Sequence, residues 1–126
     1  MANDFFYKKV EAYKKAKAFT IHIYSLVSKF PAYEQYALCD QIRRAAVSIP
    51  SNIAEGLGRM SIKERVHFLE IAYGSLTEVT CQLDIAQSLG YISEEELTNA
   101  ENLSIEVGRI MSGLRKVLID KQSNNV

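Results

Sequence analysis

The sequence contains few of the residues that interrupt helices or build covalent and metal sites. Its 126 residues include two prolines, two cysteines, two histidines and no tryptophan. Little proline leaves room for long helices, because proline inside a helix removes a backbone hydrogen bond. Cys39 and Cys81 form no C-x-x-C pair and stand near no histidine cluster. We therefore predict neither a disulfide nor a metal site, and we expect both thiols to be free and buried.

Long apolar runs and an excess charge of one sign are also missing. No segment approaches the roughly 18 uninterrupted apolar residues of a membrane span. The opening residues MANDFFYKK lack the apolar stretch of a signal peptide. The 15 basic residues are balanced by 15 acidic ones. We expect a cytoplasmic protein with no membrane partner.

A helical pattern runs through the whole chain, with apolar residues recurring at spacings of three and four. Ser61 with Glu64, and Ser93 with Glu96, have the spacing of a capping box, and Gly90 fits a left-handed helix end. The pattern predicts a polar, frayed tail over 120–126 and helices at about 8–29, 33–57, 61–89 and 93–119. Short connections make successive helices antiparallel. We predict one all-α domain over 1–126, an antiparallel up-down-up-down four-helix bundle.

The second predicted helix contains Pro50, and its apolar residues keep their period on both sides. This pattern predicts a helix that continues through the proline with a kink. Proline also frees an upstream carbonyl, and we expect Ser48 and Ser51 to satisfy such groups.

A polar stripe lies opposite the apolar one. We predict a buried structural network, at a helix or subunit contact, that joins this stripe to polar residues of the third helix, with Arg44–Glu78 and Arg59–Glu55 as its ion pairs. Its members are Arg44, Ser48, Asn52, Glu55, Arg59, Ser75, Glu78 and Gln82. The alternative makes Glu55 and Glu78 a carboxylate pair for acid–base work or metal binding. The Glu-x-x-His motif of di-metal bundles is absent.

Sequence motifs of catalysis are missing as well. The chain has no nucleophile elbow, no glycine-rich phosphate loop and no histidine-led metal motif. We interpret His22 and His67 as ordinary surface or boundary residues. We therefore expect no enzyme, no catalytic or metal-binding residue and no cofactor.

The third predicted helix is apolar around about half of its circumference or more, which is wider than a monomeric bundle needs. We interpret the excess as a contact with another subunit, with Ile71 as an outward residue. The alternative is a central, fully buried helix. Gly74 in mid-helix costs about 1 kcal/mol relative to alanine. That cost predicts a close approach by a neighbouring helix.

Two segments carry a family resemblance. QIRRAAVSIPSNIAEGLGRMSIKE, followed by FLEIAYGSLTEVTCQL, resembles the signature of a bacterial four-helix-bundle family first noticed within intervening sequences of 23S ribosomal RNA genes. The resemblance extends from about Tyr7, through Phe30-Pro31, to the LGYIS turn and the last helix. It implies a bundle that assembles as a homopentamer. It also relates the chain to the accessory variability determinant proteins that serve the reverse transcriptase of diversity-generating retroelements.

Antiparallel helices would separate the charges toward two ends. One end would hold most basic residues, and the other would hold acids that include Glu94, Glu95, Glu96 and Glu106. We therefore weigh two functions. The first is a non-catalytic homo-oligomeric scaffold that docks a partner protein. The second is a module that binds RNA or DNA without sequence preference through a basic rim. The expected contacts are Lys8, Lys9, Lys14, Lys15, Lys116 and Lys121.

Overall fold

The computed structural model describes residues 6–124, and no strand occurs among them. Four α-helices make up nearly all of this stretch. They are α1 (Glu11–Val27), α2 (Leu38–Leu57), α3 (Ile62–Ser88) and α4 (Glu94–Asn124). Two short 3-10 helices precede α1 and α2, namely η2 (Phe6–Lys9) and η3 (Ala32–Glu34). The predicted all-α four-helix bundle is confirmed.

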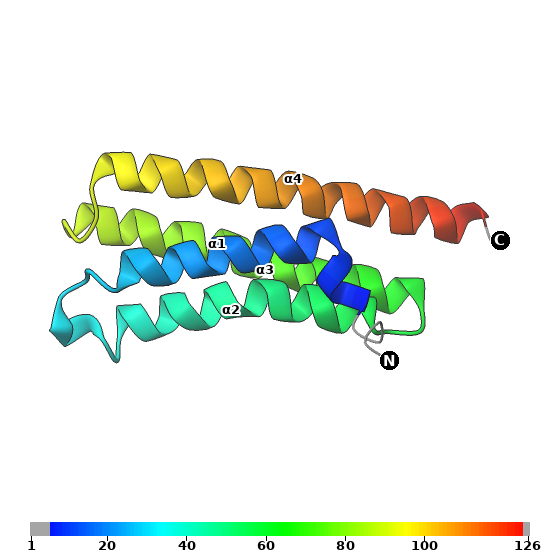
Figure 1. Ribbon diagram of the computed structural model, residues 1–126, viewed down its shortest axis with the longest axis horizontal. Coiled ribbons are helices and arrows are strands. Elements are labelled where there is room, and N and C mark those ends of the chain that lie inside the picture. Colours follow the sequence, from blue (N-terminus) through cyan, green and yellow to red (C-terminus); the bar gives the residue numbers. More distant parts are fainter. Residues whose placement is uncertain (1–5, 125–126) are drawn as a thin grey trace.

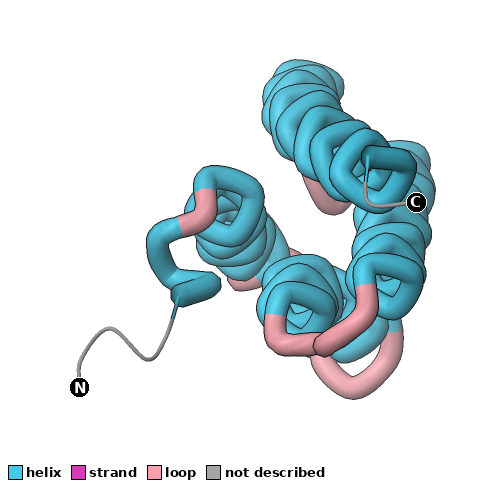
Figure 2. Tube along the Cα trace, turned by 90° about the vertical axis from the view of Figure 1, so that its right-hand side faces the viewer, coloured by secondary structure: helices cyan, strands magenta, loops and turns pink. Residues whose placement is uncertain are grey.

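Successive helices run in opposite directions along the bundle (Figure 1). Viewed along their axes, α1, α2, α3 and α4 follow one another around a common centre (Figure 2). The contact between α2 and α3 is the most extensive, and that between α1 and α4 is the smallest of the four neighbouring pairs. The C-terminal part of α4 extends beyond the other helices (Figure 1). No helix among residues 6–124 is long and apolar enough to cross a membrane.

The core consists of the apolar residues that the helical period predicts. All four helices contribute, and the largest side chains with almost no exposed surface are Ile23, Ile42, Ile49, Ile53, Val79, Leu83 and Met111. Each such side chain contributes roughly 1.5–3 kcal/mol when it leaves water. The core therefore fixes which face of each helix points inward.

The predicted helix signals are present as hydrogen bonds. Ser61 Oγ accepts from the backbone N–H of Glu64 at 3.1 Å, and Ser93 with Glu96 forms both bonds of a capping box, at 2.9 and 3.0 Å. Gly90 has φ +83°, the left-handed conformation expected after α3. These turns align α3 and α4 for antiparallel packing.

Three predicted helix boundaries were wrong. The first helix begins at Glu11, because Val10 is extended at φ −82° and ψ 130°. The second begins at Leu38, because η3 and the non-helical Ala37 follow Pro31. The last continues through Asn124 and does not fray from Asp120, since Leu118 remains buried close to its end. Residues 125–126 of the predicted tail lie outside the described residues.

Pro50 lies buried inside α2, which continues through it. Proline has no N–H for the carbonyl four residues earlier, which is that of Ala46. The hydroxyl of Thr20 on α1 lies 2.8 Å from this carbonyl oxygen and 3.0 Å from that of Ala16 in its own helix, and its one hydrogen is shared between them or given to the nearer, Ala46. We expected Ser48 or Ser51 to satisfy the freed group. That expectation was wrong, because Ser48 Oγ instead bonds to Ser75 and Asn52.

Candidate interaction surfaces

Three neutral members of the predicted polar network, Ser48, Asn52 and Ser75, form a compact cluster between α2 and α3. Ser48 Oγ and Ser75 Oγ lie 2.8 Å apart. Asn52 Nδ2 donates to both the carbonyl and the hydroxyl of Ser48, at 2.8 Å each. Buried polar groups need such partners, because an unpaired group costs about 1–3 kcal/mol. These hydrogen bonds join α2 to α3.

The charged members behave differently within one chain. Arg59 pairs with Glu55 at 2.6 Å, as expected. Arg44 pairs with Asp40 at 3.1 Å and not with Glu78, which accepts from Gln82 Nε2 at 3.2 Å. Glu55 and Glu78 are both exposed. One helical turn brings each a local partner at the surface, so a helix contact within one chain does not bury them, and their burial at a subunit contact stays a prediction.

The described residues offer no metal-binding constellation. No group of three or more histidine, cysteine, aspartate and glutamate side chains within residues 6–122 is close enough to hold a metal ion. The carboxylates of Glu55 and Glu78 are engaged separately, by Arg59 and by Gln82. His67 is exposed and stacks edge-on against Phe68, and His22 is half-buried.

The two cysteines differ in environment. Cys39 is 3% exposed, and burial raises the pKa of its thiol. Cys81 is exposed on α3, so the expectation that both thiols are buried was wrong for Cys81. Both are free, as expected.

A row of exposed residues, most of them apolar, lies on the outward side of α3. We define the outer α3 stripe as Ile71, Gly74, Glu78, Cys81, Ile85 and Leu89. All six are exposed, including 39% of Ile71, 47% of Ile85 and 53% of Leu89. The expectation that Ile71 points outward is confirmed, and the alternative of a fully buried helix is excluded for a single chain.

A cavity of about 370 Å³ opens beside this stripe, between α3 and α4. Its apolar lining includes Leu69, Tyr73 and Met111, and an ion pair joins Arg115 to Glu70 at 3.2 Å among its walls. Gly74 also lines it. A Cβ at position 74 would meet no atom of the chain within 4 Å, so the predicted close approach does not occur there within one subunit. It occurs at Gly56, where a Cβ would lie 2.8 Å from Phe68 Cβ.

A second apolar surface covers the contact of α1 with α2. We define the α1–α2 face by its exposed apolar side chains Ile21, Tyr24 and Val47, of which Ile21 is 62% exposed. A groove of about 350 Å³ runs beside Ile21 and Val47 and is also lined by Tyr7, Tyr13 and Lys17. The helical periods of the sequence did not lead us to predict this face. Ile21 and Tyr24 do lie off the apolar period that defines the core side of α1, which marks them as apolar residues outside the core.

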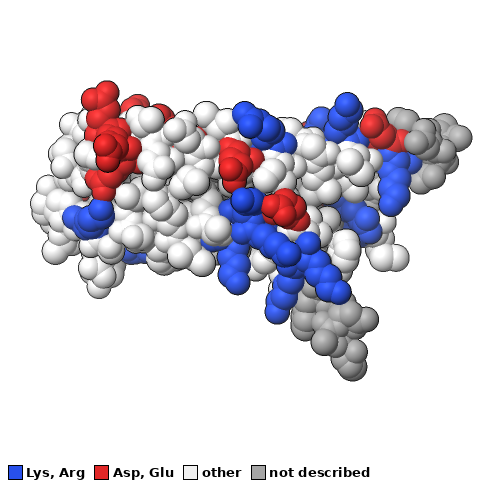
Figure 3. Space-filling model, turned by 45° about the horizontal axis from the view of Figure 1, so that its top comes forward, with Lys and Arg blue, Asp and Glu red and all other residues white. Residues whose placement is uncertain are grey.

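The predicted basic contacts lie on three elements. Lys8 and Lys9 belong to η2, Lys14 and Lys15 to α1, and Lys116 and Lys121 to α4. Lys15 pairs with Glu106 at 3.1 Å, although the two were assigned to opposite ends. Glu106 was placed wrongly, because it lies in the middle of α4 beside α1. Figure 3 shows basic side chains gathered over one side, with acidic ones interleaved.

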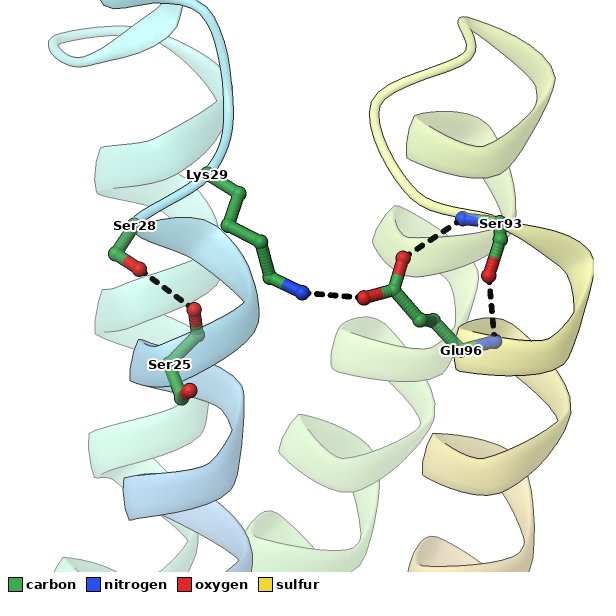
Figure 4. Close-up of polar contacts among 5 residues, drawn as sticks. All are labelled: Ser25, Ser28, Lys29, Ser93 and Glu96. Atoms are coloured by element: carbon green, nitrogen blue, oxygen red, sulfur yellow. Dashed lines mark hydrogen bonds and ion pairs between the residues drawn. The ribbon is translucent and has the colours of Figure 1, made fainter.

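Acidic side chains gather at the opposite end, where α1 and α3 end (Figure 3). There Lys29 reaches across from the end of α1 to the carboxylate of Glu96 (Figure 4). The hydrogen bond from Lys29 contributes most to lowering the pKa of Glu96, and the bond from the backbone N–H of Ser93 contributes next. Nearby, the hydroxyl of Tyr91 donates to Glu34 at 2.6 Å, and this bond raises the pKa of Tyr91. These contacts tie the two turns of this end together.

Comparison with known proteins adds a family and a fold. The model of a family described as 23S rRNA-intervening sequence protein matches residues 8–113. A crystal structure of a protein of unknown function from the S23 ribosomal protein family of Bacteroides thetaiotaomicron is 27% identical, with a TM-score of 0.74. The similarity covers 83% of this chain and 98% of that one. No match was found among curated proteins.

Proposed function

Because the chain belongs to the 23S rRNA-intervening sequence protein family, in which it resembles members that assemble as homopentamers, we propose that it is a non-catalytic, self-associating scaffold. The observation that carries this proposal is the outer α3 stripe. Monomeric proteins rarely expose large contiguous apolar patches, and such patches mark interaction sites. The number five comes from the resemblance, while the surface comes from the fold.

The spacing of the stripe suits packing against another helix. From Ile71 through Gly74, Glu78 and Cys81 to Ile85, the intervals alternate between three and four residues. This is the a/d spacing of helices that pack knobs into holes. The inner side of α3 already meets α2 and α4. Its outer side is therefore left for another molecule.

Sedimentation or light scattering on the purified chain tests the proposal. One subunit has a mass of 14.2 kDa, and we expect about five times that mass at micromolar concentration. Ile71→Glu should return the mass to that of one subunit, because a buried unpaired charge costs several kcal/mol. Ile105→Glu is the matched control, since Ile105 is also exposed, at 55% against 39% for Ile71, but lies on α4. A parent that stays a single chain would refute self-association.

A second candidate function, binding of RNA or DNA, is supported by exposed lysines of α1, one of which lines the groove of the α1–α2 face. Lys14 and Lys17 are exposed and form no ion pair within the part of the chain that the structure describes. Lys17 lines the groove together with Tyr7 and Tyr13. Cations follow a phosphate backbone, and aromatic rings stack on bases.

Fluorescence anisotropy with RNA, single-stranded DNA and duplex DNA at ~50 mM salt tests this second function. Binding should weaken steeply with salt and should be lost when Lys8, Lys9, Lys14 and Lys15 are changed together to glutamate. The matched control changes the same four residues to arginine, which keeps their charge. Absence of binding up to high micromolar protein would remove this candidate and leave the scaffold.

A further inference from the structure

We propose that the cavity between α3 and α4 is a socket for an apolar side chain from the α1–α2 face of a second copy. The inference rests on the proposed self-association and names the two surfaces that meet. It makes the interface heterologous, so that each copy offers a socket on one side and an inserting face on the other.

Gly74 is the first observation. A glycine in a helix interior is destabilising relative to alanine, and two helical glycines here are explained by neighbours. Gly56 lies against Phe68, and Gly108 lies against Tyr73. Gly74, like Gly113 on α4, has open space where a side chain would be, and Gly74 also lines the cavity between α3 and α4. Since no atom of its own chain requires this space, an approaching second copy accounts for it.

The cavity is the second observation. Its floor is formed by Leu69 and Met111, which are buried, and its open edge is Gly74. Gly74 belongs to the outer α3 stripe, so a helix that packs along the stripe passes directly over the cavity. The lining is mainly apolar and suits an aliphatic or aromatic side chain. Without that side chain the site is incomplete.

The charges of the two surfaces complement one another. Glu78 is the only charged member of the outer α3 stripe and forms no ion pair with any residue within 6–122. Arg43 and Arg44 lie beside Tyr24 and Val47 of the α1–α2 face, around a common cavity. Burial of Glu78 against another copy requires a cation. Arg44 already pairs with Asp40 at 3.1 Å, whereas Arg43 forms no ion pair within residues 6–122 and is the cation that the α1–α2 face offers.

The levels of the two surfaces along the bundle also agree. Thr20 bonds to Ala46, and Ser48 bonds to Ser75, each at 2.8 Å. These bonds place their sequence neighbours, Ile21, Val47 and Gly74, at about the same level. In a ring whose axis is parallel to the helices, rotation from one copy to the next preserves that level. Ile21 and Val47 of one copy therefore come opposite Gly74 of its neighbour.

A pair of glycine variants tests the socket in the full chain. Gly74→Gln fills it with a helix-favouring polar side chain, and Gly113→Gln makes the same change on α4, where the space is also open. We expect both variants to fold, as circular dichroism would show. Filling a packed contact weakens association by about tenfold or more, so Gly74→Gln should sediment as a smaller species while Gly113→Gln matches the parent.

Mixing two variants tests which face supplies the inserting side chain. Ile21→Glu damages the α1–α2 face but leaves the socket intact, whereas Gly74→Gln does the reverse. Mixed together, they should form a species of twice the subunit mass that neither forms alone, because one intact interface remains between them. If the mixture contains no species heavier than one subunit, the α1–α2 face does not supply the inserting side chain. If the parent assembles and Gly74→Gln assembles equally well, the socket is wrong while self-association stands. A monomeric parent would refute both.

Discussion

The substitution Gly56→Ala examines the tightest contact between α2 and α3. A Cβ at position 56 would lie 2.8 Å from Phe68 Cβ and 3.2 Å from the carbonyl oxygen of Arg65. Neither atom is the end of a flexible side chain, since one is a Cβ and the other belongs to the backbone. Normal separation of the two carbons requires α2 and α3 to move apart by roughly 1 Å, and such a gap forfeits a quarter to a half of each neighbouring dispersion contact.

The expected cost follows from two opposing effects. Overpacking of this kind costs about 1–3 kcal/mol, and we place it at the upper end because α2 and α3 share the most extensive interface. Alanine recovers about 1 kcal/mol through its higher helix propensity. The net loss of unfolding free energy is about 2 kcal/mol. For a chain of this size, that lowers the melting temperature by about 8 °C.

Thermal and urea unfolding followed by circular dichroism measure this effect. All samples need the same protein concentration, because association alters the apparent stability. Gly113→Ala is the control, since a Cβ there meets nothing within 4 Å, and it should stabilise by up to about 1 kcal/mol. If Gly56→Ala melts at or above the parent while the control behaves as expected, the close approach of α2 and α3 at Gly56 is refuted.

Three further predictions concern thiols, polar groups and pH. Ellman's reagent at neutral pH should modify one thiol, Cys81, in the dissociated chain and a second only after unfolding, because burial raises the pKa of Cys39; rapid reaction of both thiols in the native state would contradict this. Asn52→Ala should lower the unfolding free energy by about 1–3 kcal/mol through loss of its two bonds to Ser48. Glu55→Ala should cost less than about 1 kcal/mol, because exposed ion pairs contribute little. Equal losses of the two variants in urea titrations would contradict this difference between the neutral cluster of α2 and α3 and the exposed ion pair. The pKa of Glu96 is lower in the folded state than its ordinary value of 4.5. Its stabilising contribution is therefore present above that pH and disappears as the pH falls through the folded pKa. The melting temperature of Glu96→Gln should depend less on pH than that of the parent between about pH 5 and pH 3.

The sequence was sufficient for the architecture because local signals and the apolar period agreed. The two capping boxes and Gly90 are short-range features, and each determines a helix end without reference to distant residues. The start of α2 was missed because no such local signal marks it. The apolar period of the sequence continues past Pro31, whereas in the structure η3 interrupts the helix there. Glycine had a more ambiguous meaning. Helix propensity marks Gly56 and Gly74 alike, but only the packed structure shows which one touches a neighbour within the chain.

The candidate surfaces were less predictable, because charge partners are chosen in three dimensions. The spacing of Glu55 and Arg59 within one helix predicted their ion pair correctly. The pair of Arg44 with Glu78 was wrong, since Asp40 lies one turn away on the same helix. Sorting charges by helix end likewise failed for Glu106, which meets Lys15 across the bundle. The apolar period of α1 already sets Ile21 and Tyr24 apart from the core side, but only the fold shows that they lie with Val47 of α2 on one face.

The bond between Thr20 and Ala46 gives Pro50 a meaning beyond a tolerated break in α2. In an uninterrupted helix every inner carbonyl is already occupied, and a neighbouring helix that slides by one turn finds an equivalent surface. Pro50 creates one carbonyl that differs from the rest, and Thr20 is the hydroxyl positioned to find it. A slide of α1 by one turn would leave that carbonyl buried and unpaired, at about 1–3 kcal/mol. The missing backbone donor of α2 thus acts as a reference mark that specifies a single longitudinal alignment of α1, among several that apolar packing alone would accept.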